Sequence, residues 1–127
     1  MDTRGSFSIT DDRASDWATV LSVTGEVDMK TSPSFHRGLL RAVGAGRGGL
    51  VVDLSQASFL DSAALTSLTS AFDALRRRGG GSLAIVCSDP RMRAIFDVAR
   101  LDRNFRIYES RAEALAALSA LADSSAT

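Results

Sequence analysis

The chain has 127 residues, of which 15 are lysine or arginine and 15 are aspartate or glutamate, so its formal net charge is zero. This length suits one domain over 1–127, and the neutral balance argues against a partner recruited by overall charge, such as nucleic acid or anionic lipid. A single cysteine, Cys87, excludes an internal disulfide and indicates a reducing compartment. No apolar run approaches the ~18 residues of a membrane span, and no apolar signal core opens the chain, so the sequence predicts a cytoplasmic protein without membrane contact.

Strand-like and helix-like patterns take turns between polar ends at 1–5 and 123–127, so the predicted core covers about 6–122. The predicted elements are strands at 7–10, 17–25, 50–54, 83–87 and 105–108 and helices at 33–43, 62–78, 90–99 and 111–121. Two strands come first and strands then alternate with helices, which implies an antiparallel hairpin followed by parallel strands with helical crossovers. The predicted fold class is α/β, a single domain with a mixed β-sheet and about four α-helices.

Turns and helix starts are marked by their residue types. Residues 11–16 predict the turn of the first hairpin, and residues 55–61 predict a loop between the central strand and the second helix. Ser32-Pro33 predicts an N-cap followed by the first helical residue, and Asp89-Pro90 predicts the start of the third helix. The segment from Ser110 to Glu113 has the form of a capping box at the start of the last helix.

Acidic residues follow the carboxyl ends of the predicted strands. In α/β folds, ligand and effector sites gather at these strand ends and at the helix N-termini beside them. Asp28 and Ser62 each come after a predicted strand, so the sequence predicts that they share one edge of the sheet. Asp61 and Asp89 add further carboxylates, and this edge is therefore expected to be acidic although the whole chain is neutral.

Ser62 stands at the predicted start of the second helix and has two interpretations. The first N–H groups of a helix have no intrahelical partners, so a phosphate on an exposed Ser62 hydroxyl would meet free donors and the positive end of the dipole. Asp61 and Ser62 could equally serve as a helix cap with no further role. Capping and phosphorylation do not exclude each other.

Signals for catalysis and nucleic-acid binding are weak. His36 is the one histidine, and no third group accompanies it toward a serine, so a packing or solvent-facing role is favoured. Gly79–Gly81 follows a helix and lacks the Lys-Ser/Thr of a phosphate-binding loop, which favours a turn. Arg76–Arg78 falls in a last helical turn, where cations are favourable beside the dipole. We therefore expect no enzyme, no catalytic residue, no metal site and no nucleic-acid partner.

Several segments together resemble the STAS-domain family of anti-sigma factor antagonists. Val23–Asp28 looks like the family's Gly-Glu-hydrophobic-Asp loop, and Val51–Ser55 followed by Phe59–Ser62 looks like its central strand and phosphoacceptor loop. Gly80–Leu83 and Ala99–Leu101 are similar to two later stretches of the family. Each piece alone is weak, but order and spacing agree over nearly the whole chain, from about residue 7 to residue 121.

The resemblance implies a role for the chain as a binding switch. It implies that Ser62 is the phosphoacceptor and that Asp28, Asp61, Ser62, Ala63 and Ala64 bind the partner. The unphosphorylated protein would bind an anti-sigma factor serine kinase and free a sigma factor. The kinase would phosphorylate Ser62, and a metal-dependent serine phosphatase would reverse this step. ATP and magnesium would belong to the partners, so the chain itself is expected to have no cofactor. The chain is neutral and has no obvious exposed apolar patch, so a monomer is expected.

Ala63 and Ala64 depart from the family, which often has Ser or Thr and then Gly after the acceptor. Alanine favours a helix by about 1 kcal/mol over glycine, so a stiffer helix start is expected, with an added methyl where the kinase approaches. Two other functions remain open beside the switch. One is a STAS-like module that binds a small ligand or scaffolds a complex, and the other is a hydrolase that uses Ser62.

Overall fold

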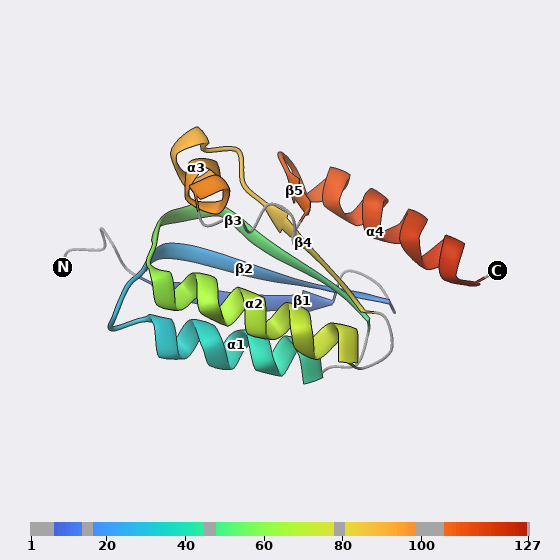
Figure 1. The fold of residues 1–127 in the computed structure, drawn as a ribbon, viewed down its shortest axis with the longest axis horizontal. Coiled ribbons are helices and arrows are strands. Elements are labelled where there is room, and N and C mark those ends of the chain that lie inside the picture. Colours follow the sequence, from blue (N-terminus) through green and yellow to red (C-terminus); the bar gives the residue numbers. More distant parts are fainter. Residues whose placement is uncertain (1–6, 14–16, 45–47, 78–80, 99–105, 127) are drawn as a thin grey trace.

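The computed structural model describes residues 7–13, 17–44, 48–77, 81–98 and 106–126, with the side chains of 121–126 left out. Within these residues the elements are β1 (Ser8–Arg13), β2 (Ala18–Val27), α1 (Ser32–Gly44), β3 (Gly49–Leu60), α2 (Ser62–Arg77), β4 (Ser82–Val86), α3 (Pro90–Val98), β5 (Arg106–Tyr108) and α4 (Arg111–Ala126). The strands form one sheet in the order β1-β2-β3-β4-β5 (Figure 1). β1 pairs antiparallel with β2 and the other neighbours are parallel, so the predicted mixed α/β fold is confirmed.

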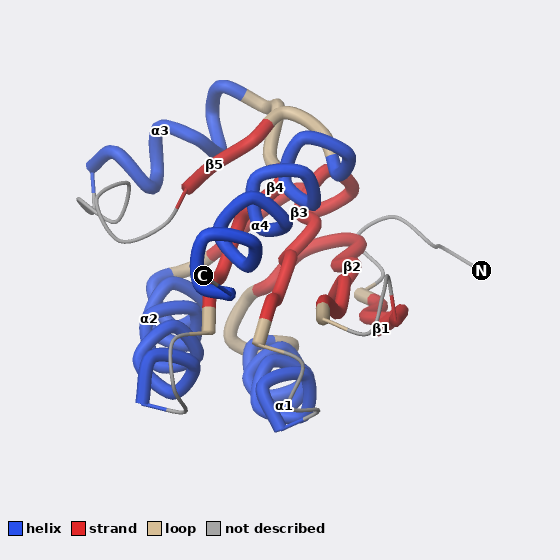
Figure 2. The backbone as a smooth tube through the Cα atoms, turned by 90° about the vertical axis from the view of Figure 1, so that its right-hand side faces the viewer, coloured by secondary structure: helices blue, strands red, loops and turns tan. Residues whose placement is uncertain are grey.

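Helices cover both faces of the sheet. α1 and α2 lie side by side on one face, and α4 lies on the other (Figure 2). The larger apolar cluster joins the sheet to α1, α2 and α3, and it includes Phe35, Leu68 and Phe96. The smaller cluster lies under α4 and includes Val51 and Leu118. Because the central strands are covered on both faces, their residues are almost all apolar, as the sequence of the third strand predicts.

β3 continues to Leu60, so the loop predicted at 55–61 is wrong for 55–60, and Asp61 is the one residue between β3 and α2. The pairing of β3 with β2 shifts register twice, and the second shift leaves Ser58 without a partner beside Gly25, whose φ of 90° suits glycine. These bulges change the spacing of the buried side chains: Leu54, Ala57 and Leu60 all reach the larger core cluster although they are three residues apart. The second half of β3 therefore lacks the alternation of apolar and polar residues by which a strand is recognised in a sequence. Its last residue, Leu60, lies one residue before the start of α2.

A polar cluster fixes the strand just before the first bulge. Asp53 is buried, and its Oδ1 accepts hydrogen bonds from the Ser55 N–H at 3.0 Å and the Ser55 hydroxyl at 2.7 Å. Arg111, the first residue of α4, donates from Nε and Nη2 to Asp53 Oδ2 at 3.2 and 2.9 Å. Its Nη2 also donates to Ser22 Oγ at 2.9 Å. The cluster thus ties the N-terminus of α4 to β2 and β3.

Several predicted element ends differ from the structure. The turn predicted at 11–16 is wrong for 11–13, because these residues pair with β2 and extend β1 to Arg13, while 14–16 lie outside the described residues. The polar tail predicted at 123–127 is wrong through Ala126, because α4 continues that far and no glycine or proline stops it. The expectations for Arg78, Gly79, Gly80, Ala99, Leu101, Phe105 and the Leu121 side chain also lie outside the described residues.

The starts of the helices confirm three of the four predicted caps. The first helix is the exception: it begins at Ser32, and the carbonyl of Thr31 accepts the N–H of Phe35 at 3.1 Å, so Thr31 is the cap in place of Ser32. Asp89 Oδ1 accepts the Arg91 N–H at 2.9 Å. At α4, Ser110 Oγ accepts the Glu113 N–H at 3.2 Å, which is one half of a capping box, while Glu113 Oε2 accepts the N–H of Glu109 at 3.4 Å in place of that of Ser110. The third confirmed cap, at α2, belongs to the candidate site below.

Thr19 is expected to limit the stability of the fold. Among the described residues, its Oγ1 is the one buried side-chain oxygen or nitrogen without a hydrogen-bond partner. Thr19→Val removes that hydroxyl and keeps the shape, so it should stabilise the protein by about 1 kcal/mol, measured by urea unfolding. Thr19→Ser keeps the hydroxyl and deletes the methyl, and it should destabilise. A Thr19→Val variant that is less stable than the native protein would contradict this account.

Candidate functional site

Ser62 is exposed and is the first residue of α2. Asp61 caps the helix: its Oδ1 accepts the Ala64 N–H at 2.9 Å, and its carbonyl accepts the Leu65 N–H at 3.3 Å. The prediction that this pair starts a helix is therefore confirmed, with Asp61 as the cap. The N–H groups of Ser62 and Ala63 precede the first intrahelical donor, so they point out of the helix N-terminus beside the Ser62 hydroxyl.

Asp28 stabilises the turn between β2 and α1. Its Oδ1 accepts the N–H groups of Lys30 and Thr31 at 3.0 and 3.2 Å, and its own N–H donates to Thr31 Oγ1 at 2.9 Å. The hydroxyl of Thr31 donates to the carbonyl of Glu26 at 2.7 Å. The N–H of Lys30, more than the other bonds, lowers the pKa of the Asp28 carboxyl below its ordinary value of 3.8. Asp28 is therefore a fixed negative charge with one oxygen held by its own turn.

The two acidic turns lie at the same edge of the sheet. Val27, the last residue of β2, pairs with Leu60, the last residue of β3. The carbonyl of Val27 also accepts the N–H of Asp61 at 3.0 Å. This contact joins the turn that carries Asp28 to the residue before Ser62, so the predicted common edge is confirmed. Both carboxylates are partly exposed, and they give this edge a negative charge.

The two alanines after Ser62 differ in exposure. Ala63 is exposed, so its methyl is available to a partner that approaches the helix start. Ala64 is fully buried and belongs to the larger core cluster. The prediction that Ala64 binds the partner is therefore corrected, because its methyl packs beneath the site. Directly after Ser62, the exposed methyl is that of Ala63.

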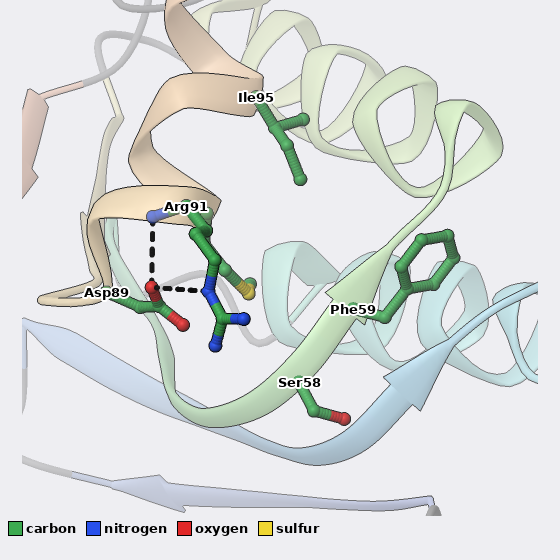
Figure 3. Close-up of a pocket in the computed structure, with 6 residues that line it drawn as sticks. Ser58, Phe59, Asp89, Arg91 and Ile95 are labelled. Atoms are coloured by element: carbon green, nitrogen blue, oxygen red, sulfur yellow. Dashed lines mark hydrogen bonds and ion pairs between the residues drawn. The ribbon is translucent and has the colours of Figure 1, made fainter.

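A small hollow adjoins this edge between the end of β3 and the first turns of α3 (Figure 3). Its volume is about 190 Å³, and it is lined by Ser58, Phe59, Asp89, Arg91, Met92 and Ile95. In Figure 3, Arg91 and Ile95 extend from α3 toward β3. We call these six residues the α3 hollow.

Two exposed apolar side chains near Ser62 escaped the sequence-based prediction. Met29, in the turn that Asp28 holds, is 86% exposed, and Phe59 is 46% exposed. Phe59 faces outward because the bulge at Ser58 leaves two successive residues of β3 exposed before Leu60 returns to the core. The available signal was the sequence Phe59-Leu60 after a segment without alternation, where the two apolar side chains cannot both lie on the core face.

His36 pairs with a serine other than Ser62. Its Nδ1 lies 3.1 Å from the Oγ of Ser67, so the contact links α1 to α2. Ser67 is more than one helical turn after Ser62 in the sequence of α2. Across the described part of the chain, no cluster of three His, Cys, Asp or Glu side chains could hold a metal ion. Likewise, none of the helices in the described ranges has both the length and the apolar composition needed to cross a membrane.

Loss of the Asp61 cap should weaken the helix start on which Ser62 stands. Asp61→Ala removes the acceptor of the Ala64 N–H and is expected to destabilise the protein by about 1 kcal/mol in urea unfolding. Asp61→Asn retains an acceptor oxygen at the same place and should lose at most a few tenths of that value. Equal losses for the two variants would show that the charge of Asp61, and not its capping bond, stabilises the fold.

The comparisons with known proteins agree on one family. A family model described as the STAS domain matches residues 10–114. The solved structure of an anti-sigma factor antagonist from Mycobacterium paratuberculosis is 29% identical, covers 91% of this chain and 96% of its own, and has a TM-score of 0.83.

Two further structures are of the anti-sigma factor antagonist SpoIIAA. Its unphosphorylated form is 16% identical, with coverage of 84% of this chain and 92% of that chain and a TM-score of 0.65. The phosphorylated form of this Bacillus cell fate determinant is 17% identical, with coverage of 85% and 96% and a TM-score of 0.66. Curated protein sequences give no significant match. Since the family model spans most of the chain and the fold is that of these structures, the chain belongs to the STAS domain family.

Proposed function

We propose that this protein is an anti-sigma factor antagonist whose binding is switched off by phosphorylation of Ser62. The observation that carries the proposal is the exposed Ser62 at the N-terminus of α2, beside Asp61, which caps that helix. The similarity to the M. paratuberculosis antagonist supports the general role. SpoIIAA, which has the same fold and is described in a phosphorylated and an unphosphorylated form, supports the switch.

The proposed cycle takes place in the cytoplasm and involves two partners of this chain, a kinase and a phosphatase. The unphosphorylated protein binds an anti-sigma factor that is also a serine kinase, and a sigma factor is released. The kinase transfers the γ-phosphoryl group of ATP to the Ser62 hydroxyl, whose proton leaves, and the antagonist dissociates. A metal-dependent phosphatase hydrolyses the phosphate and restores the binding form. ATP and magnesium belong to these enzymes, and this chain contributes the acceptor hydroxyl and the surface around it.

The electrostatics of the helix start explain why the protein stays folded when its binding is lost. A phosphate adds about −1.5 to −2 charges at pH 7. Inside the domain, the N–H groups of Ser62 and Ala63 and the helix dipole favour that charge. Asp28 and Asp61 already make the same edge negative, so a partner that covers it would have to desolvate an even larger charge. We therefore expect dissociation without refolding.

The test is a phosphorylation assay with the purified protein. The chain is incubated with ATP, magnesium and each candidate anti-sigma kinase from the same genome, and the site is mapped by mass spectrometry. We expect one phosphate, on Ser62, and none on a Ser62→Ala variant. Ser58 and Thr66 are exposed hydroxyls close by in sequence and serve as internal controls. A phosphate on either of them, or on no residue with any candidate kinase, would overturn the proposed switch.

A further inference from the structure

The α3 hollow is lined by apolar side chains, two of which, Phe59 and Ile95, are not fully buried. Met92 forms a buried part of its lining, Ile95 is partly buried, and the Phe59 ring is 46% exposed. Ile95 and Phe59 line the hollow from α3 and from β3 and lie outside both core clusters, so their apolar surfaces are free to accept a further apolar group. Exposed apolar side chains grouped around a concave surface are typical of interaction sites.

The size of the hollow decides what kind of group it can accept. Pockets for metabolites and cofactors have volumes of about 300–1,000 Å³, well above the 190 Å³ found here. A cavity of about 150 Å³ is nevertheless large enough for benzene. The hollow is therefore too small for a free ligand of cofactor size, but it fits one large apolar side chain presented by another protein.

Arg91 supplies the positive charge at the rim, beside the carboxylate of Asp89. Its side chain is 92% exposed, and its Nε lies 3.6 Å from Asp89 Oδ1. That oxygen already accepts the Arg91 backbone N–H at the shorter distance of 2.9 Å. An exposed ion pair of this length contributes little, so the guanidinium can turn to a carboxylate on a partner at small cost. Arginine and aromatic residues are also the types that dominate the binding energy of protein interfaces.

The hollow is continuous with the site at Ser62. Phe59 is a lining residue of the hollow and stands three residues before Ser62 on the same strand end, where β3 passes directly into α2. Met29 lies at the same edge, in the turn joined to Asp61 through Val27. A partner that covers Ser62 can therefore reach the hollow without leaving this end of the molecule.

We propose that the α3 hollow anchors the anti-sigma factor by taking one of its large apolar side chains, with a neighbouring carboxylate of the partner on Arg91. This inference rests on the proposed function. Ser62 carries the charge that decides whether the complex forms, and the hollow determines which anti-sigma factor is bound. The two contacts are separate because phosphorylation of Ser62 leaves the lining of the hollow chemically unchanged.

The test measures the dissociation constant of the complex between the unphosphorylated full chain and the anti-sigma factor that phosphorylates Ser62. The method is isothermal titration calorimetry. Ile95→Asp places a charge in the hollow and should weaken binding about 30-fold, and Arg91→Glu should weaken it about 10-fold. Ala94→Asp adds the same charge at an exposed neighbouring position that does not line the hollow, and it should change binding less than about 3-fold. Unfolding curves establish whether each variant is folded. The Arg91 side chain is 92% exposed, so Arg91→Glu still tests the proposal if Ile95→Asp does not fold.

The outcomes separate this inference from the proposed function. If the native chain binds, Ser62→Asp abolishes binding, and both hollow variants bind as well as Ala94→Asp, the hollow is not an anchor and the switch stands. If the native chain binds no anti-sigma factor, both proposals fail. A carboxylate-to-lysine change in the partner that restores binding to Arg91→Glu would identify the matching charge. Self-association of the native chain that Ile95→Asp removes would instead assign the hollow to a second copy and overturn the inference.

Discussion

Ser62→Asp is expected to weaken binding to the anti-sigma factor by about 100-fold, whereas Ser62→Ala should bind within about 3-fold of the native protein. The substitution places a negative charge on an edge that already holds Asp28 and Asp61, and the partner must cover that charge. Alanine removes the hydroxyl without adding charge, so it keeps the binding form but cannot accept phosphate. Calorimetric titration of both variants with the same anti-sigma factor gives the two dissociation constants.

A matched control separates the position of the charge from its mere presence. Ser70 is an exposed serine farther along the same helix, and Ser70→Asp changes the net charge of the protein equally. We expect Ser70→Asp to bind like the native protein. If Ser62→Asp and Ser62→Ala bound equally well, the proposed electrostatic switch would be wrong. If Ser70→Asp were as weak as Ser62→Asp, the effect would come from overall charge and not from the helix start.

Arg111→Met is expected to destabilise the fold by about 2 kcal/mol at pH 7, because it leaves the buried Asp53 carboxylate without the guanidinium. This figure allows for solvent, since the Arg111 side chain is 45% exposed. Methionine keeps much of the apolar stem that packs at the start of α4. Urea unfolding of the native protein and the variant measures the difference in free energy.

The same contact predicts how the difference changes with pH. Burial acts to raise the pKa of Asp53, but hydrogen bonds from Ser55 and Arg111 outweigh it and hold the pKa below the ordinary value of 3.8. The native state thus binds this proton less readily than the unfolded chain, so the stabilisation is present above about pH 4 and is lost as pH falls through the lower native value. The effect of Arg111→Met should therefore shrink between pH 7 and pH 3. If the difference in unfolding free energy between the native protein and Arg111→Met stayed constant with pH, it would indicate lost packing alone. Asp53→Asn has no titratable group at this position and is the control.

How far the sequence predicts the fold is clearest in β3. Its first half, Leu50 to Leu54, is an apolar run that predicts a central strand, and the structure confirms it. Its second half has no alternation, because two bulges move the buried positions to Leu54, Ala57 and Leu60. A bulge depends on pairing with β2, and Gly25 with its φ of 90° lies on that other strand. No local pattern in residues 55–60 carries this information.

The candidate site was predictable where its residues act locally. Asp61 before Ser62 has the residue types of a helix start, and Asp28 follows a strand, so both positions could be placed from the sequence. The sequence indicates that Phe59 and Leu60 cannot both face the core, but which of the two is exposed depends on which face of β3 meets the core. The burial of Ala64 depends in the same way on the orientation of α2. The α3 hollow is formed by segments about 30 residues apart, Ser58-Phe59 and the start of α3, so only the folded chain brings it together.

The unbroken run from β3 into α2 also has an entropic consequence. Ordering one residue of a flexible loop costs about 1–2 kcal/mol, and a partner that had to fix residues 55–61 would lose that free energy from its binding. Here those residues are already held by pairing with β2 and by the contact between Val27 and Asp61. Association should therefore cost little conformational entropy, as expected for a rigid surface. The affinity of the complex then depends mainly on the chemical groups that this surface presents.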